Sequence, residues 1–149
     1  MIDFKTLPLL AAATETEAEQ LRSAAQVIDA LPGDALFPDY TITDGFWILT
    51  RGNWRVTRRV AGTPQVMFEA DRLGTWTGGI PVIDAIAPPK AEVLAPSQFL
   101  KIPSAVLERI VSQNPQIAKR LLEAVQWGAG HIGGLIPANQ PITSKETNQ

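Results

Sequence analysis

The residues of this chain that are best able to bind a ligand lie around two adjacent glycines, Gly78 and Gly79. Glycine tolerates positive φ angles and lets another group come close to the backbone, so the pair predicts a tight turn that something packs against. A short strand is expected before the turn, over residues 73–77, and an apolar piece leads from it to a new strand that ends near Val93. This order of elements is typical of a backbone cradle for a small anion. The sequence predicts the place of the site but not the identity of the ligand.

Eight residues are candidate ligand contacts, and each also has a purely structural interpretation. They are Arg58, Trp76, Thr77, Gly78, Gly79, Ile80, Lys90 and Ala91. The glycine pair could serve only a tight turn, Lys90 could be a solvated lysine at the start of a strand, and Trp76 could belong to the core. Arg58 could place a positive charge inside the fold or extend its charged end to solvent.

The composition argues against several classes of site. The chain has no cysteine and a single histidine, His131, in a glycine-rich stretch near its end. Catalytic zinc sites, cupin-type metal sites and Ser-His-Asp triads all need histidines in a cleft, so we expect no metal, no cofactor and no enzymatic activity. A formal net charge of −2 argues against nucleic-acid binding by phosphate neutralisation.

Length and hydropathy predict one soluble domain. The chain has 149 residues, of which 45% are hydrophobic and 19% charged, and a domain of this size buries roughly 70% of the surface of its unfolded chain. No apolar run is long enough for a membrane span and the N-terminus lacks a signal-peptide pattern, so we expect no membrane partner and a cytoplasmic location. The domain is expected to cover residues 1–134, followed by a disordered tail over residues 135–149.

Helices are expected before and after a run of strands. Thr14 and Glu17 have the spacing of a capping box, which marks the start of the first helix. Asn114 followed by Pro115 is typical of a helix that has asparagine as its N-cap and proline in its first turn. The expected helices cover residues 15–25, 104–111 and 115–127.

The sequence around Gly52 and Asn53 predicts a β-hairpin. Two β-rich runs, residues 46–51 and 54–60, flank this dipeptide, which favours a two-residue type II′ turn. The turn would pair Arg51 with Trp54, Leu49 with Val56, and Trp47 with Arg58. One face would carry Trp47, Leu49, Trp54 and Val56, and the solvated face Ile48, Thr50, Arg55, Thr57 and Arg59. Arg58 would then face the indole of Trp47, where a cation–π contact contributes about 1 kcal/mol.

The remaining strands complete a fold that is mainly β. They are expected over residues 26–31, 35–37, 66–70, 73–77, 91–95 and 98–102, with Val66, Phe68 and Ala70 alternating along one of them. The buried side chains should include Trp47, Leu49, Trp54, Val56, Phe68 and Ile102. One helix, many short strands and two final helices predict an α+β fold that closes a β-roll of the jelly-roll type.

Three motifs in this order resemble the cyclic nucleotide-binding domain of the bacterial catabolite-activator and protein-kinase regulatory-subunit type. The first is Pro32-Gly33-Asp34-Ala35-Leu36-Phe37, which looks like the entry to the roll in that family. The second is residues 46–56, similar to its aromatic–isoleucine–leucine–x–x–glycine hairpin, and the third is Leu100-Lys101-Ile102-Pro103, which resembles the strand before its C-terminal helices. The resemblance spans residues 7–127 and implies that residues 76–91 occupy the place of the phosphate-binding cassette.

The chain departs from the family pattern within this cassette. Where the family has a glutamate for the ribose hydroxyl, this chain has Gly79, and where the family has an arginine for the cyclic phosphate, it has Pro89. The following serine or threonine is replaced by Lys90, whereas Ala91 keeps the family's alanine. Pro81 also removes one amide from the turn. The resemblance therefore implies a divergent cassette without the bidentate arginine that binds phosphate.

These features together predict a non-catalytic sensory or regulatory module. Ligand binding to the cassette would move the C-terminal helices, and a partner would sense that movement. Cyclic AMP and cyclic GMP are not expected to bind, so the ligand would be another small anion. Two alternatives remain open: a protein-interaction or dimerisation module with a dead ligand site, and a cyclic nucleotide binder with substitute residues. The partner would be another protein or a second copy, in a weak homodimer formed through the stripe of Ile117, Leu121, Leu122 and Val125.

Overall fold

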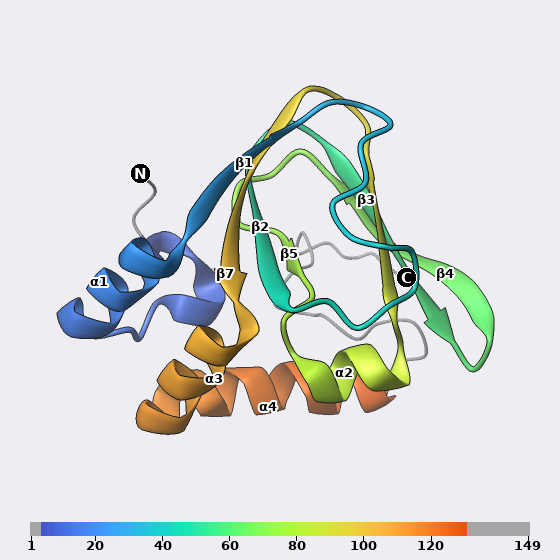
Figure 1. Ribbon diagram of the computed structural model, residues 1–149. Helices are drawn as coiled ribbons and strands as arrows, with labels where there is room; N and C mark the ends of the chain where they lie inside the picture. The colour runs from blue at the N-terminus through green and yellow to red at the C-terminus, as the bar shows by residue number, and fades with distance from the viewer. Residues whose placement is uncertain (1–3, 131–149) are drawn as a thin grey trace.

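The computed structural model describes residues 4–130 and places seven strands in two antiparallel sheets (Figure 1). The elements in chain order are η1 (Phe4–Thr6), η2 (Pro8–Leu10), α1 (Glu15–Ala24), β1 (Gln26–Ala30), β2 (Gly45–Arg51), β3 (Trp54–Val60), β4 (Thr63–Ala70), β5 (Trp76–Thr77), α2 (Pro81–Ile86), β6 (Pro89–Val93), β7 (Ser97–Pro103), α3 (Ser104–Gln113) and α4 (Pro115–Gly130). The strand orders are β1-β7-β2-β5 in one sheet and β4-β3-β6 in the other. The expected α+β roll is confirmed.

Two hydrophobic cores lie on opposite faces of the four-stranded sheet. The roll core, between the two sheets, contains Ala30, Phe37, Trp47, Leu49, Trp54, Val56, Met67, Phe68, Ala70, Ala91, Val93 and Phe99. The helical core, on the other face, includes Phe46, Ile48, Trp76, Leu100 and Ile102 from the strands, and Leu10, Leu21, Leu107, Ile110 and Ile117 from the helices. All six side chains that were expected to be buried are buried. Burial on both faces explains why the β2 residues from Gly45 to Leu49 are all buried.

The expected hairpin between β2 and β3 is wrong. The two strands follow each other in sequence but belong to different sheets, β2 pairing with β5 and β7, and β3 with β4 and β6. The observed partners are Phe99 for Leu49, Phe68 and Ala91 for Val56, and Gln65 and Pro89 for Arg58. Gly52, with φ of +115°, and Asn53 form a corner, where the Asn53 amide donates to Ser97 Oγ at 3.1 Å. The corner is favoured over a hairpin because β2 and β3, when they lie in different sheets, each pair with two other strands and enclose the roll core between them.

Three side chains differ from the expected pattern of exposure. Ile48 was expected on the solvated face but is fully buried, because helices cover that face of the sheet. Thr57 is also buried, and Val66 is 59% exposed. The register of β3 and β4 shifts between Val56 and Thr57, and this irregularity reverses the alternation that placed Val66 with Phe68.

The segments on either side of β2 also differ from expectation. No strand forms over residues 35–37; Phe37 instead packs on Trp47, with ring centroids 6.1 Å apart. The expected strand over residues 73–77 is reduced to β5, because Gly74 has φ of +95°. The apolar piece after the glycines is a short helix, α2, which has Pro81 in its first turn.

The helix boundaries agree well with the sequence signals. Thr14 and Glu17 form both hydrogen bonds of the capping box at the start of α1. Asn114 Oδ1 accepts from the amides of Gln116 and Ile117, at 3.0 and 3.3 Å, as the N-cap of α4. His131, the domain boundary at residue 134 and the expected tail over residues 135–149 lie outside the described residues.

Candidate functional site

The paired glycines lie against the backbone of the chain itself. Gly78 and Gly79 have φ of +78° and +77°, as expected for a tight turn. A Cβ atom at position 79 would lie 2.6 Å from Cβ and 2.7 Å from Cα of Phe46, and one at position 78 would lie 2.8 Å from the carbonyl oxygen of Gly45. Strand β2 therefore occupies the close approach that the glycines permit.

Arg58 makes three hydrogen bonds near the turn. It lies on the inward face of β3 with a side chain that is only 1% exposed. Its Nη1 donates to Asp84 Oδ1 at 3.2 Å and to the carbonyl of Ala87 at 2.8 Å, and its Nη2 donates to Thr77 Oγ1 at 3.1 Å. The side chain thus neither extends to solvent nor stacks on Trp47 in the expected hairpin pairing, and instead joins both ends of segment 77–87 to the opposite sheet.

Arg58 and Asp84 form a buried ion pair that is incompletely hydrogen-bonded. Burial raises the pKa of the Asp84 carboxyl and lowers the pKa of the Arg58 guanidinium. The charge of each group opposes the shift of the other, and backbone hydrogen bonds from Gly79 and Ile80 also oppose the shift of Asp84. Arg58 Nε and Asp84 Oδ2 are both buried and have no hydrogen-bond partner among the described residues. The contact between them is a single Nη1–Oδ1 pair, although a guanidinium and a carboxylate are able to form two parallel bonds.

The space between the two sheets is occupied by aromatic side chains. Phe37, Trp47, Phe99, Trp54 and Phe68 form a continuous series in which neighbouring ring centroids lie 4.9–6.4 Å apart. Nε1 of Trp54 donates to Thr75 Oγ1 at 2.9 Å, so the polar atom of this buried indole is satisfied. The aromatic series therefore makes up a large part of the roll core.

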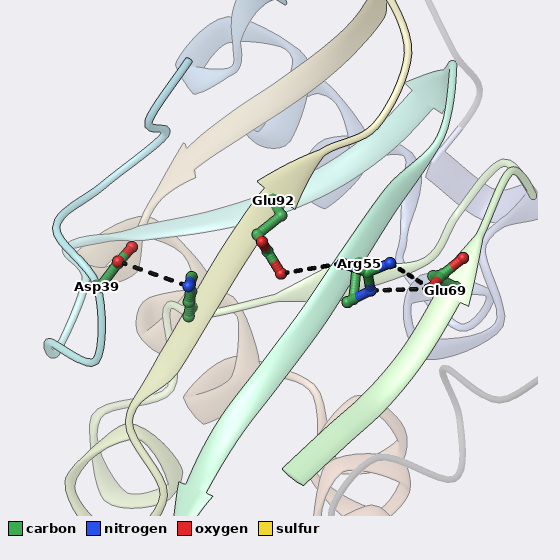
Figure 2. A network of polar contacts seen from close by, with 5 residues as sticks. Asp39, Arg55, Glu69 and Glu92 are labelled. Carbon is green, nitrogen blue, oxygen red and sulfur yellow. Dashed lines mark hydrogen bonds and ion pairs between the residues drawn. The ribbon is translucent and has the colours of Figure 1, made fainter. Parts of the chain in front are cut away.

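Lys90 points away from the roll core. Its neighbours on β6, Pro89 and Ala91, are buried, and its ammonium lies 3.9 Å from Asp39 Oδ2. The same outer face of the three-stranded sheet carries a charge network in which Arg55 Nη2 lies 2.7 Å from Glu69 and Nη1 lies 3.4 Å from Glu92 (Figure 2). Lys90 is therefore a component of the outer surface rather than a neighbour of Arg58.

The structure brings together only part of the expected site. Thr77 contacts Arg58, and Ala91 lies on the inward face of β6. Trp76 and Ile80 belong to the helical core, where the Trp76 ring lies 5.1 Å from that of Phe46. The ligand-binding role of all eight residues stays a prediction.

Asp84 is the residue of this region that the sequence analysis missed. It is fully buried and pairs with Arg58. The signal available was weak: a proline three residues earlier, at a position typical of the first turn of a helix, would place Asp84 in that turn.

A second polar cluster joins the N-terminal and C-terminal helices. Asn114 Nδ2 donates to Glu17 Oε1 at 2.8 Å and to the carbonyl of Ala12 at 2.9 Å. The Thr14 amide donates to the same Glu17 oxygen at 2.9 Å. Burial raises the pKa of the Glu17 carboxyl, but these hydrogen bonds outweigh burial and hold the pKa below its ordinary value.

The C-terminal helices lie close to the glycine turn. A groove of about 390 Å³ lies between the glycine turn and these two helices. It is lined by Gly79, Ile80, Pro81, Leu107, Glu108, Val111, Ser112 and Leu121. Ile117, from the expected apolar stripe of α4, is fully buried in the helical core, whereas Leu122 is 55% exposed. The stripe thus contributes both to the core and to the surface.

Two kinds of feature are absent from residues 4–130, namely a membrane-spanning helix and a metal-binding cluster. No helix in this range is both long and apolar enough to cross a membrane. No group of three or more histidine, aspartate or glutamate side chains in this range is placed to hold a metal ion.

The same fold occurs in solved structures of regulatory proteins. No protein-family model and no curated protein sequence matches this chain. The sensor domain of the transcriptional regulator DNR from Pseudomonas aeruginosa superposes with a TM-score of 0.69 at 15% identity, covering 83% of each chain. The regulatory subunit of a cAMP-independent protein kinase A from Trypanosoma brucei gives 0.69 at 16% identity, over 93% of this chain and 47% of that one. The catabolite activator protein of Thermus thermophilus gives 0.64 at 15% identity, over 83% and 58%. The chain has the fold of a cyclic nucleotide-binding domain.

Proposed function

We propose that this chain is a non-catalytic regulatory module that acts through protein contacts and does not respond to cyclic mononucleotides. The observation that carries the proposal is that the chain's own groups occupy the surroundings of the cassette. Strand β2 lies against the two glycines, Asp84 pairs with Arg58, and aromatic rings fill the roll core. The fold in which these groups lie is that of sensor and regulatory domains.

The two positions that would anchor a cyclic nucleotide lack suitable side chains. Gly79 has no carboxylate for a ribose hydroxyl, and a larger residue there would clash with Phe46. Pro89 has no charge for a phosphate, and Lys90 lies on the outer face. Hydrogen bonds to charged groups contribute about 1.5–3 kcal/mol each. Losing two of them would weaken a micromolar site to between about 0.1 and 20 mM.

Calorimetric titration with cyclic AMP and cyclic GMP tests the proposal. We expect no saturable heat at submillimolar ligand. A dissociation constant of about 10 μM or tighter for either nucleotide would refute it and favour a nucleotide binder with substitute residues. The protein kinase A regulatory subunit from Trypanosoma brucei described as cAMP-independent supports the view that this fold also serves proteins without a response to cyclic AMP.

The output surface in this proposal is formed by α3 and α4. These helices face the glycine turn across the groove, and α4 carries Leu122 on its surface. Sedimentation at high micromolar concentration should reveal a weak dimer that Leu122→Glu dissociates. Val66→Glu is the matched control, because Val66 is similarly exposed but lies on β4. A wild-type chain that stays monomeric would remove self-association and leave a heterologous protein as the partner.

A further inference from the structure

We propose that Asp84 acts as an internal ligand: its carboxylate occupies the anion-binding position of Arg58 and holds segment 77–87 in place of a free anion. The inference rests on the proposed function and adds to it the reason why the module needs no ligand. It also predicts the chemical class that would bind if the carboxylate were removed, namely a small oxyanion such as acetate or inorganic phosphate.

The position of Arg58 supports an anion site at this point. Arg58 lies directly opposite Pro89 on the neighbouring strand, so its side chain leaves the sheet on the same face as that of Pro89. The guanidinium therefore reaches the inner side of the cassette from β3. Guanidinium groups match the geometry of carboxylates and phosphates, and Asp84 is the acidic side chain paired with it.

The contacts of Arg58 are those expected of a clamp. Thr77 lies just before the glycine turn, Asp84 lies within α2, and Ala87 follows α2. One side chain thus holds both ends of the segment, and it does so from the opposite sheet. Without a charge to balance the guanidinium at this depth, the clamp would carry the full cost of a buried cation. Asp84 offsets part of that cost and fixes α2 at the same time.

The ion pair between Arg58 and Asp84 uses only part of the hydrogen-bonding capacity of the guanidinium. Asp84 is attached to a six-residue helix and presents one oxygen to one nitrogen of Arg58, at 3.2 Å. Arg58 Nε and Asp84 Oδ2 have no hydrogen-bond partner among the described residues. A free oxyanion is not tethered and is able to turn so that two of its oxygens meet the guanidinium. The truncation of Asp84 to alanine should therefore create an anion site and not merely a cavity.

The test is chemical rescue of the full chain. Asp84→Ala should lower the melting temperature, and acetate or phosphate should raise it again in a saturable way, by about 5–10 °C at a hundredfold excess over the dissociation constant. The wild type and the double variant Arg58→Met/Asp84→Ala should respond only as they do to sodium chloride of equal ionic strength. Hydrogen exchange over residues 77–87 should rise in Asp84→Ala and fall again with the anion.

The outcomes separate the inference from the proposed function. Rescue that is equal in the single and the double variant, or no rescue at all, would overturn the inference, as would exchange in segment 77–87 that does not follow anion binding. Should Asp84→Ala not fold, Asp84→Ser, which is smaller than aspartate and still leaves space beside Arg58 for the anion, gives the same two readouts. Titration of the wild type with cyclic AMP tests only the proposed function, since no cyclic nucleotide enters the rescue experiment.

Discussion

Replacing Asn114 by aspartate should destabilise the protein strongly at neutral pH and only weakly in acid. Aspartate is as good an N-cap as asparagine, so the start of α4 is preserved. The change removes the amide that donates to Glu17 at 2.8 Å and puts a second carboxylate beside the first. Two like charges about 4 Å apart repel by about 4 kcal/mol at an effective dielectric constant of 20.

Proton uptake sets a ceiling on this penalty. Protonating a carboxyl group of ordinary pKa at neutral pH costs about 4 kcal/mol of free energy, which is about three pKa units at 1.36 kcal/mol each. The repulsion cannot cost more than this, because one of the two carboxylates would then take up a proton. Together with the lost hydrogen bonds, we expect a fall in the free energy of unfolding of about 3–5 kcal/mol at neutral pH and about 1–2 kcal/mol near pH 4.5, where the two carboxyls share a proton. Urea unfolding followed by tryptophan fluorescence measures both values.

Two matched variants isolate the charge. Asn114→Ser keeps an N-cap and loses the amide donor without adding a charge, so its cost should be about 1–3 kcal/mol at neutral pH and somewhat less in acid, where Glu17 is protonated. Asn114→Asp/Glu17→Gln reverses donor and acceptor and should recover most of the stability. Equal stability of Asn114→Asp and Asn114→Ser at neutral pH would show that Glu17 is not an ionised neighbour and would refute the reasoning.

Three further predictions concern other buried groups. Gly79→Ala combines a positive φ with a clash and should cost about 2–5 kcal/mol in chemical unfolding, against about 1 kcal/mol for Gly62→Ala, where φ is +84° but the space is open; similar costs would mean that β2 does not press on the turn. Glu17 has a lowered pKa, so the unfolded state binds more protons than the folded state and the contribution of Glu17 to stability is lost as pH falls below about 4.5. Glu17→Gln should abolish this contribution in acid titrations of the urea midpoint, and an unchanged acid loss would contradict the prediction. Thr75→Val leaves the indole N–H of Trp54 without its acceptor and should cost about 1–3 kcal/mol in the free energy of unfolding. Trp54→Phe removes the same hydrogen bond, so the costs of the two changes should not add fully in the double variant.

The sequence predicted the elements of this fold better than their pairing. Local signals such as the capping box at Thr14 and the N-cap at Asn114 were reliable, because they depend on hydrogen bonds within a few residues. The hairpin at Gly52 failed because its two strands find partners far along the chain, and a turn motif carries no information about those partners.

The sequence indicated the glycine turn and an inward charge at Arg58 but not the groups that they contact. Arg58 stood out as a charge on an inward position, and its side chain is buried instead of extending to solvent. Its partner, Asp84, lies on a helix too short to show a periodic pattern, and the pair is formed only when the two sheets close. The close approach at Gly79 was expected, but the approaching group is β2 and not a ligand.

The place of β7 in the four-stranded sheet determines when the protein is able to fold. β1 and β2 do not pair with each other; β7 lies between them and pairs Gln26 with Lys101 and Phe46 with Ile102. During synthesis, β1 therefore has no strand partner until residues 97–103 have left the ribosome. Sheets that depend on such distant pairing fold slowly and expose unpaired strand edges until the last strand is in place. We expect a late, nearly all-or-none folding event, in which the final strand and the helices behind it complete both cores together.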